Sequence, residues 1–147
     1  MPLTLLAPVI KTFKLEKCDE TGDTQVTFRQ ATMKEDERRA ELLADQQYSW
    51  NDKEVGVITR KTKWSYPELM RLECYLTMTE CNIDVQVGKA DDGTPKTEPL
   101  FKFGKIGVMM GESAFKDACG KLPANAAYEI HQCCLQVNKD WAPNPEA

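Results

Sequence analysis

The stretch at residues 115–141, FKDACGKLPANAAYEIHQCCLQVNKDW, constrains the fold of this chain more than any other. It predicts a short helix, a Lys-Leu-Pro stop and a second amphipathic helix. Apolar residues recur at helical spacing, the proline suits a first helical turn, and Asn138 suits a C-terminal stop. We expect Leu122, Ile130 and Trp141 to anchor this helix pair on the core. Because the stretch carries packing information and little chemistry, it favours a binding protein over a catalyst.

At 147 residues, with 41% hydrophobic and 29% charged residues, the chain has the size and balance of one globular domain. We expect residues 1–147 to form a single domain. A flexible loop at about residues 88–99, rich in Gly, Pro, Thr and charge, would separate an N-terminal α+β part from a C-terminal helical part.

The charge balance argues against nucleic-acid binding. The formal net charge is −4 and the pI is about 5.1, so no broad positive field attracts a phosphate backbone. Arg60, Lys61 and Lys63 stand beside Trp64, an arrangement that can hold a single strand. Acidic residues flank this cluster and dilute its field, so a solvated strand end is the favoured interpretation.

The N-terminal sequence MPLTLLAPVI is briefly apolar but has no basic leader, long apolar centre or small-residue cleavage site. No run approaches the roughly eighteen apolar residues that span a bilayer. We therefore expect a cytosolic protein with no membrane partner.

Six cysteines, at positions 18, 74, 81, 119, 133 and 134, show no CxxC spacing. Without a secretion signal, reduced thiols that behave as small hydrophobes are the favoured interpretation. His131 is the only histidine, so a zinc site would have to gather ligands from distant segments. We expect no metal and no cofactor.

The first third of the chain predicts a hairpin and a helix. Apolar residues alternate at residues 9–16 and 25–30, and turn-forming residues separate these two predicted strands. Thr32 and Glu35 form a capping box, which starts a helix that we expect to run to about Gln47.

The predicted helix after Thr32 has an apolar side and a charged side. We expect Ala40, Leu43 and Ala44 on the buried side and the EDERR block facing solvent. Within this block, Glu35 is spaced to pair with Arg38 or Arg39 one turn later.

The middle of the chain predicts a third strand at residues 54–60 and a second helix. A second capping box begins at Ser65 and closes at Glu68, with Pro67 in the first turn. The helix that follows is the most apolar in the chain and should lie at its centre. Its expected seam consists of Leu69, Leu72 or Glu73, and Leu76.

Beyond that helix, residues 81–87 alternate as another strand and residues 88–99 read as the flexible loop. Residues 100–110 suit a short hairpin, and residues 112–119 a short helix that Gly120 closes. Together the elements predict an α+β fold in which N-terminal antiparallel strands pack with a few amphipathic helices. A C-terminal helix pair closes the fold.

The residues with chemical potential do not form a recognisable catalytic set. His131 lies beside Ile130 at the edge of the predicted buried stripe, where a surface or capping role is favoured. Cys134 follows it at i+3, but any helix brings such a pair together. The glycines of FGKIGVMMG lack the Gly-Lys-Ser/Thr ending of a phosphate loop. We expect no catalytic and no cofactor-binding residues.

The order of these motifs resembles that of tail assembly chaperones of long-tailed bacteriophages. The resemblance covers most of the chain. It is carried by VTFRQATMKEDERRAEL, by ELMRLECYLTMTECNI, by the PLFKF strand, and by GKLP followed by a helix and an N-x-x-W ending at Trp141.

This resemblance implies a non-enzymatic protein that binds the long, helical tape measure protein in the host cytoplasm. Such a chaperone keeps its client soluble and presents it to tail tube subunits. A client with amphipathic helices requires an exposed apolar surface on the chaperone. The candidate partner-binding residues are Met109, Met110, Leu122, Ile130 and Trp141. Self-association into a homo-oligomer stays open.

Two other functions stay open. A structural virion protein, such as a tail, neck or tail-completion subunit, would use the hairpin and edge strands to build a ring. A small cysteine-dependent enzyme would need a thiol of lowered pKa beside His131.

Overall fold

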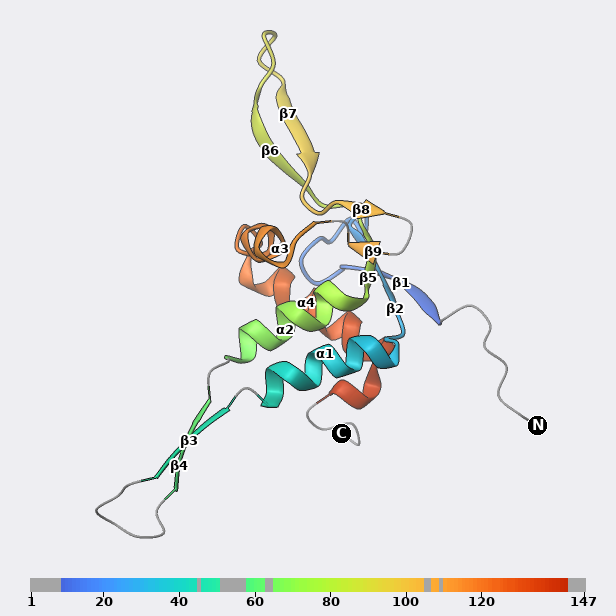
Figure 1. Ribbon diagram of the computed structural model, residues 1–147. Coiled ribbons are helices and arrows are strands. Elements are labelled where there is room, and N and C mark those ends of the chain that lie inside the picture. The colour runs from blue at the N-terminus through green and yellow to red at the C-terminus, as the bar shows by residue number, and fades with distance from the viewer. Residues whose placement is uncertain are drawn as a thin grey trace, which may run out of the picture.

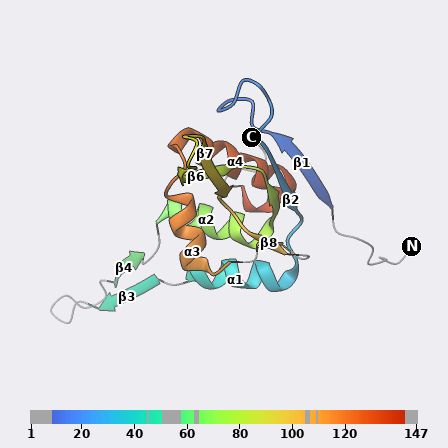
Figure 2. The same ribbon diagram turned by 90° about the horizontal axis from the view of Figure 1, so that it is seen from above.

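The computed structural model of the chain describes residues 9–44, 46–50, 58–62, 65–104, 107–108 and 110–142. Helices and antiparallel strands alternate along these residues, which confirms the predicted α+β class. The strands β1, β2 and β5 form a three-stranded sheet in that order. Figures 1 and 2 show the helices gathered on one side of this sheet.

The predicted N-terminal hairpin is confirmed. β1 (Ile10–Lys14) pairs antiparallel with β2 (Gln25–Arg29). Val26 and Phe28 of β2 are fully buried, as their alternation predicted. The connecting turn is held by the carboxylate of Asp19, which accepts hydrogen bonds from the hydroxyls of two threonines at 2.7 Å each. These hydrogen bonds lower the pKa of Asp19 to about 2.

The capping box at Thr32 is also confirmed, and it starts α1 (Met33–Ala44). The backbone N–H of Thr32 donates to Glu35 Oε1 at 2.8 Å, and that of Glu35 donates to Thr32 Oγ1 at 3.4 Å. The helix ends at Ala44, short of the predicted Gln47, because the next residues enter a strand.

That strand is β3 (Gln46–Trp50), which pairs antiparallel with β4 (Ile58–Thr62). The third strand predicted at residues 54–60 therefore overlaps β4 only at its end, and residues 51–57 lie outside the described residues. Of the basic cluster, Arg60 and Lys61 belong to β4, whereas positions 63 and 64 are likewise not described.

The predicted orientation of α1 is wrong in part. Ala40 and Ala44 are exposed instead of buried, whereas Leu43 is half-buried. Within the EDERR block, Asp36 and Glu37 are exposed as expected. Glu35, Arg38 and Arg39 are half-buried instead, and each pairs with an opposite charge on another element.

The ion pairs of α1 likewise differ from the predicted pairs within the helix. Glu35 pairs with Arg29 of β2, and Arg38 pairs with Glu112. Opposite charges on neighbouring elements therefore decide which side of this weakly apolar helix packs.

The apolar helix α2 (Tyr66–Thr77) begins as predicted. The Ser65 hydroxyl accepts a hydrogen bond from the backbone N–H of Glu68 at 3.4 Å, and Pro67 lies in the first turn. The helix packs against α1, against the C-terminal helices and against β2, so its central position is confirmed. Leu69, Leu72 and Glu73 of the predicted seam are all buried, whereas Leu76 is half-buried.

α2 continues directly into β5 (Met78–Cys81), which pairs antiparallel with β2. The strand predicted at residues 81–87 is thus divided: β5 ends at Cys81, and β6 (Asp84–Lys89) follows after two residues.

The flexible loop predicted at residues 88–99 is instead part of a hairpin. β6 pairs antiparallel with β7 (Pro95–Pro99) through a turn in which Asp92 accepts hydrogen bonds from Thr94. The turn-forming residues that suggested a linker are those of the hairpin tip, where Gly93 has a φ of +86°. Figure 1 shows this hairpin and the β3–β4 hairpin projecting from the body.

The remaining elements close the core. β8 (Phe103–Gly104) pairs with β9 (Gly107–Val108), in line with the predicted short hairpin. α3 (Glu112–Cys119) ends at a Gly120 cap, and α4 (Ala124–Val137) leads into a 3₁₀ turn (Lys139–Trp141).

One hydrophobic cluster extends from Leu15 to Trp141, so the predicted N-terminal and C-terminal parts share a core. Ile130 and Trp141 are buried in this cluster and Leu122 packs against it, as expected of anchoring residues.

Asn138 joins the end of α4 to the start of α1. It caps α4 through its backbone N–H, which donates to Cys134 O at 2.9 Å. Its side-chain oxygen accepts from the N–H of Ala31 at 2.8 Å, and its amide donates to Arg29 O at 3.2 Å. The side chain therefore supplies hydrogen-bond partners to the N–H of Ala31 and the carbonyl of Arg29, which the sheet and α1 do not supply.

We expect Asn138→Ala to lower the free energy of unfolding by about 2–3 kcal/mol, because it leaves partly buried backbone groups without partners. Urea unfolding followed by circular dichroism measures the change. The control is Gln132→Ala on the exposed side of α4, which should stay within about 0.5 kcal/mol of the unmodified chain. Equal effects of the two substitutions would contradict this role of Asn138.

Candidate functional site

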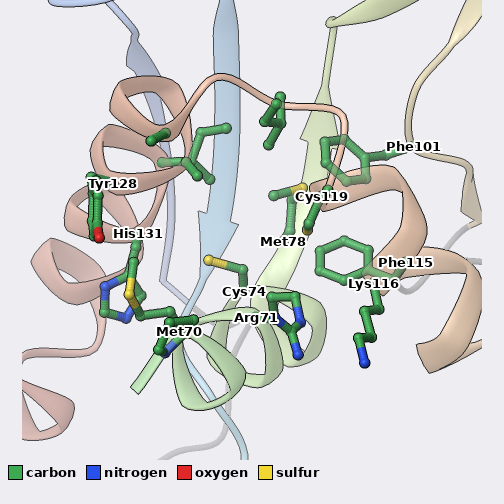
Figure 3. Close-up of a pocket in the computed structure, with 16 residues that line it drawn as sticks. Met70, Arg71, Cys74, Met78, Phe101, Phe115, Lys116, Cys119, Tyr128 and His131 are labelled. Carbon is green, nitrogen blue, oxygen red and sulfur yellow. The ribbon is translucent and has the colours of Figure 1, made fainter. Parts of the chain in front are cut away.

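A cavity of about 310 Å³ lies between α2, α3 and α4. Figure 3 shows the side chains that surround it. Its volume is at the lower end of the range of about 300–1,000 Å³ that is usual for ligand sites, and it can receive one or two large apolar side chains. Its apolar wall consists of Met70, Cys74, Met78, Phe101, Phe115, Cys119, Leu122, Ala127 and Ile130.

The helical repeat explains how the sequence builds this wall. Met70, Cys74 and Met78 are spaced by four residues, so they line one side of α2 and its exit. Phe115 and Cys119 repeat the same spacing on α3. The cavity is thus bounded by the stacked side chains of packed helices.

Phe101 closes one end of the cavity. Its ring centroid lies 5.1 Å from that of Phe115, and the two rings are tilted by 36°. Tyr75 also packs against Phe115, with a centroid distance of 5.2 Å. This aromatic row fixes the position of Phe115 and hence that of the α3 wall.

The cavity opens to the surface past exposed residues. Pro67, Lys116 and Tyr128 are exposed lining residues, and Tyr128 has 56% of its surface accessible. Lys116 and the half-buried Arg71 are lining residues with permanent positive charge, and the lining contains no carboxylate. The opening is therefore cationic although the chain as a whole is acidic.

His131 borders the cavity from a position that differs from the prediction. It has 1% of its surface accessible, so the predicted surface role is wrong. α4 packs against both α2 and β2, and a helix held from two sides buries a wider stripe than its apolar residues indicate. The position next to Ile130 is therefore buried as well.

The partner of His131 is Glu73, which also has 1% of its surface accessible. Glu73 Oε1 lies 2.6 Å from His131 Nε2, and its Oε2 lies 2.6 Å from Arg39 Nε. The Arg39 guanidinium extends the network to Trp141, whose ring centroid is 5.2 Å away and whose carbonyl accepts from Arg39 Nη2 at 3.3 Å.

The network around Glu73 contains a carboxylate and an imidazole, and both side chains have 1% of their surface accessible. His131 Nδ1 is buried and has no hydrogen-bond partner among the residues that the structure describes, and the His131 side chain lines the cavity. The contacts of Glu73 with Arg39 and His131 join α1, α2 and α4.

The cysteines are free thiols in the structure. Burial raises the pKa of Cys81, Cys119 and Cys133 to about 11. The pKa of Cys74 is also raised well above its usual value, first by a hydrogen bond with Cys134 and then by burial. Because only the thiolate is nucleophilic, these protonated thiols are poorly suited to catalysis at neutral pH.

Among the described residues, no three His, Cys, Asp or Glu side chains gather where they could hold a metal ion. The same part of the chain contains no helix of the length and hydropathy needed to cross a membrane.

The five predicted partner-binding residues fall in different places. Leu122 and Ile130 line the cavity. Trp141 is buried elsewhere, and its indole N–H donates to Asp36 at 2.8 Å.

Of the two methionines of the predicted partner surface, Met110 does not join Leu122 and Ile130 in the cavity lining. Met110 is half-buried, and its carbonyl accepts a hydrogen bond from the Tyr75 hydroxyl at 2.8 Å. Met109 lies outside the described residues.

Several lining residues escaped the sequence reasoning as site residues, among them Cys74, Phe101 and Phe115. The four-residue spacing on the two helices was a usable signal, but it is also the signal of an ordinary core. Only the meeting of three helices in the structure distinguishes a cavity wall from an ordinary core.

No family model matches the chain, and no curated protein or solved structure matches it significantly.

We expect Glu73→Ala to lower the free energy of unfolding by about 3–5 kcal/mol, because it leaves Arg39 and His131 buried without their acceptor. Urea unfolding measures the loss. The matched control is Glu112→Ala, which breaks the exposed pair with Arg38 and should cost about 1 kcal/mol or less. Similar losses for the two variants would contradict the central role of Glu73.

We expect alkylation of Cys81, Cys119 and Cys133 by iodoacetamide to be slow at pH 8 and to accelerate up to about pH 11. Their raised pKa keeps them as neutral thiols below that value. Mass spectrometry of the peptides gives each rate. In urea the same cysteines should react as ordinary thiols, with rates that level off near pH 9. A native profile that also levels off near pH 9 would contradict the effect of burial.

Proposed function

We propose that this protein is a non-enzymatic tail assembly chaperone of a long-tailed bacteriophage. It would bind the tape measure protein in the host cytoplasm and promote assembly of the tail tube. One observation carries the proposal. An apolar cavity opens to the surface beside Leu122 of the GKLP segment and Ile130 of the helix that follows it, and the resemblance to this family depends on this part of the chain.

The lining of the cavity suits an exchangeable client. A tape measure protein offers long amphipathic helices, and a helix binds by placing its apolar side chains into a groove. Met70 and Met78 contribute flexible, polarisable thioethers that adapt to different side chains. A cavity for one or two side chains gives modest affinity, which suits a chaperone that must release its client during assembly.

The chemistry of the remaining residues supports a binding role. The raised pKa values of the buried thiols disfavour covalent catalysis. The net charge of −4 disfavours a nucleic-acid partner, and the sequence offers no apolar run for a membrane partner.

A structural virion protein is the second candidate, and one observation favours it. The β6–β7 hairpin projects from the body, and every residue of β7 is exposed. An isolated two-stranded hairpin is marginal in water and gains stability by contact with a neighbour. In a ring of identical subunits, the next subunit would supply that contact.

The test is an affinity capture from infected cells with the tagged full chain. We expect mass spectrometry to identify the tape measure protein with the unmodified chain. Ala127→Phe fills the cavity and should reduce this recovery at least tenfold. Ala40→Phe adds the same ring to an exposed position on α1 and should not change it. Circular dichroism confirms that both variants fold.

Purified virions separate the two candidates. A chaperone is absent from mature particles, whereas a ring subunit is present in several copies for each tail. Failure of the unmodified chain to recover the tape measure protein, together with its presence in virions, would replace the chaperone proposal with the structural one.

A further inference from the structure

We propose that the segment bound by this cavity is an amphipathic helix that carries acidic side chains one turn from its inserted apolar residue. The inference rests on the proposed chaperone function and specifies its client. The observation behind it is the sign of the charge at the opening of the cavity.

Arg71 and Lys116 supply the permanent charge of the lining. They come from α2 and α3, and Figure 3 shows both close to the Phe115 ring. Neither takes part in the ion pairs between described residues, which use Arg29, Arg38 and Arg39 together with His131.

Carboxylates near the cavity are not part of its lining. Glu68 and Glu112 line a neighbouring hollow, which Arg71 and Lys116 also line. Arg38 already engages Glu112 at 3.1 Å. The two permanently charged residues of the cavity lining are therefore both positive, although the protein carries a net charge of −4.

This combination specifies the chemistry of the occupant. The wall requires a large apolar side chain, and the opening requires negative charge close to it. On a helix, residues three or four positions apart lie about 5–6 Å from each other on one face. A Leu or Phe followed at that spacing by Glu or Asp therefore matches both parts of the site. Lysine at the same positions would be repelled.

The expected effect is a preference rather than an absolute requirement. Lys116 is exposed and Arg71 is half-buried, so each pair with a client carboxylate is partly screened by water. Two such pairs favour an acidic segment, and repulsion by the same two residues disfavours a basic one. Together these effects correspond to about a tenfold difference in affinity between the two segments at low salt. The difference should shrink as the ionic strength rises, because exposed charges are screened.

The test uses the full chain and three synthetic helical peptides of about eighteen residues with an identical Leu and Phe stripe. The positions one turn from this stripe carry Glu, Gln or Lys. Fluorescence anisotropy gives each dissociation constant at low and high salt. We expect the Glu peptide to bind about tenfold more tightly than the Lys peptide at low salt, with the Gln peptide between them.

Two double variants locate the preference. Arg71→Glu with Lys116→Glu should reverse it. Lys11→Glu with Lys34→Glu makes the same change in net charge at exposed positions on β1 and α1, and should leave the preference intact. Ala127→Phe should weaken binding of all three peptides. If circular dichroism shows that the double Glu variant does not fold, Arg71→Gln with Lys116→Gln replaces it. This second variant should abolish the preference.

Equal affinities of the unmodified chain for the Glu and Lys peptides would overturn the inference. A reversal of the preference for the Glu peptide by the control pair at positions 11 and 34 would also overturn it. So would an Ala127→Phe variant that binds the peptides with unchanged affinity. Capture of the tape measure protein distinguishes these failures from a failure of the proposed function. If the client is still recovered, the chaperone function stands without the acidic recognition. If the unmodified chain never recovers it, the function itself falls.

Discussion

The shared carboxylate of Glu73 holds the helices of this protein in their relative positions. A carboxylate with 1% of its surface accessible loses its hydration, and only well-placed donors compensate for that loss. Arg39 of α1 and His131 of α4 supply the donors at 2.6 Å each. The guanidinium of Arg39 also reaches Trp141, so the closing turn is positioned through the same group. Three helices and the end of the fold therefore depend on one side chain.

The cavity inherits its shape from this arrangement. Glu73 immediately precedes Cys74 in α2, and His131 immediately follows Ile130 in α4, so two walls are fixed by groups one residue away from them. The third wall is held by the aromatic contacts of Phe115 with Phe101 and Tyr75. The proposed client would therefore meet walls whose backbone positions are already held by packing.

The features that sequence reasoning identified are the local ones. The capping box at Thr32 and the serine cap at residue 65 depend on residues three positions apart, and the N-terminal hairpin depends on a short turn. The features that were predicted wrongly depend on residues far away in the sequence. The inward face of α1 is set by a pair 34 residues apart, and the burial of His131 by one 58 residues apart. Two residues of the cavity lining were within reach of sequence reasoning, because Leu122 and Ile130 follow helical spacing in the sequence. Phe101 joins them only through tertiary packing.

The amide of Asn138 has a consequence for the order of events during synthesis. It binds backbone groups of Ala31 and Arg29, which lie 107 and 109 positions earlier in the chain. The segment that follows β2 therefore cannot form these hydrogen bonds until Asn138, at the end of α4, has emerged from the ribosome. Native contacts of this separation slow folding and leave early segments incompletely packed in the nascent chain. The exit of the N-terminal hairpin is thus joined to a residue that is synthesised more than a hundred positions later.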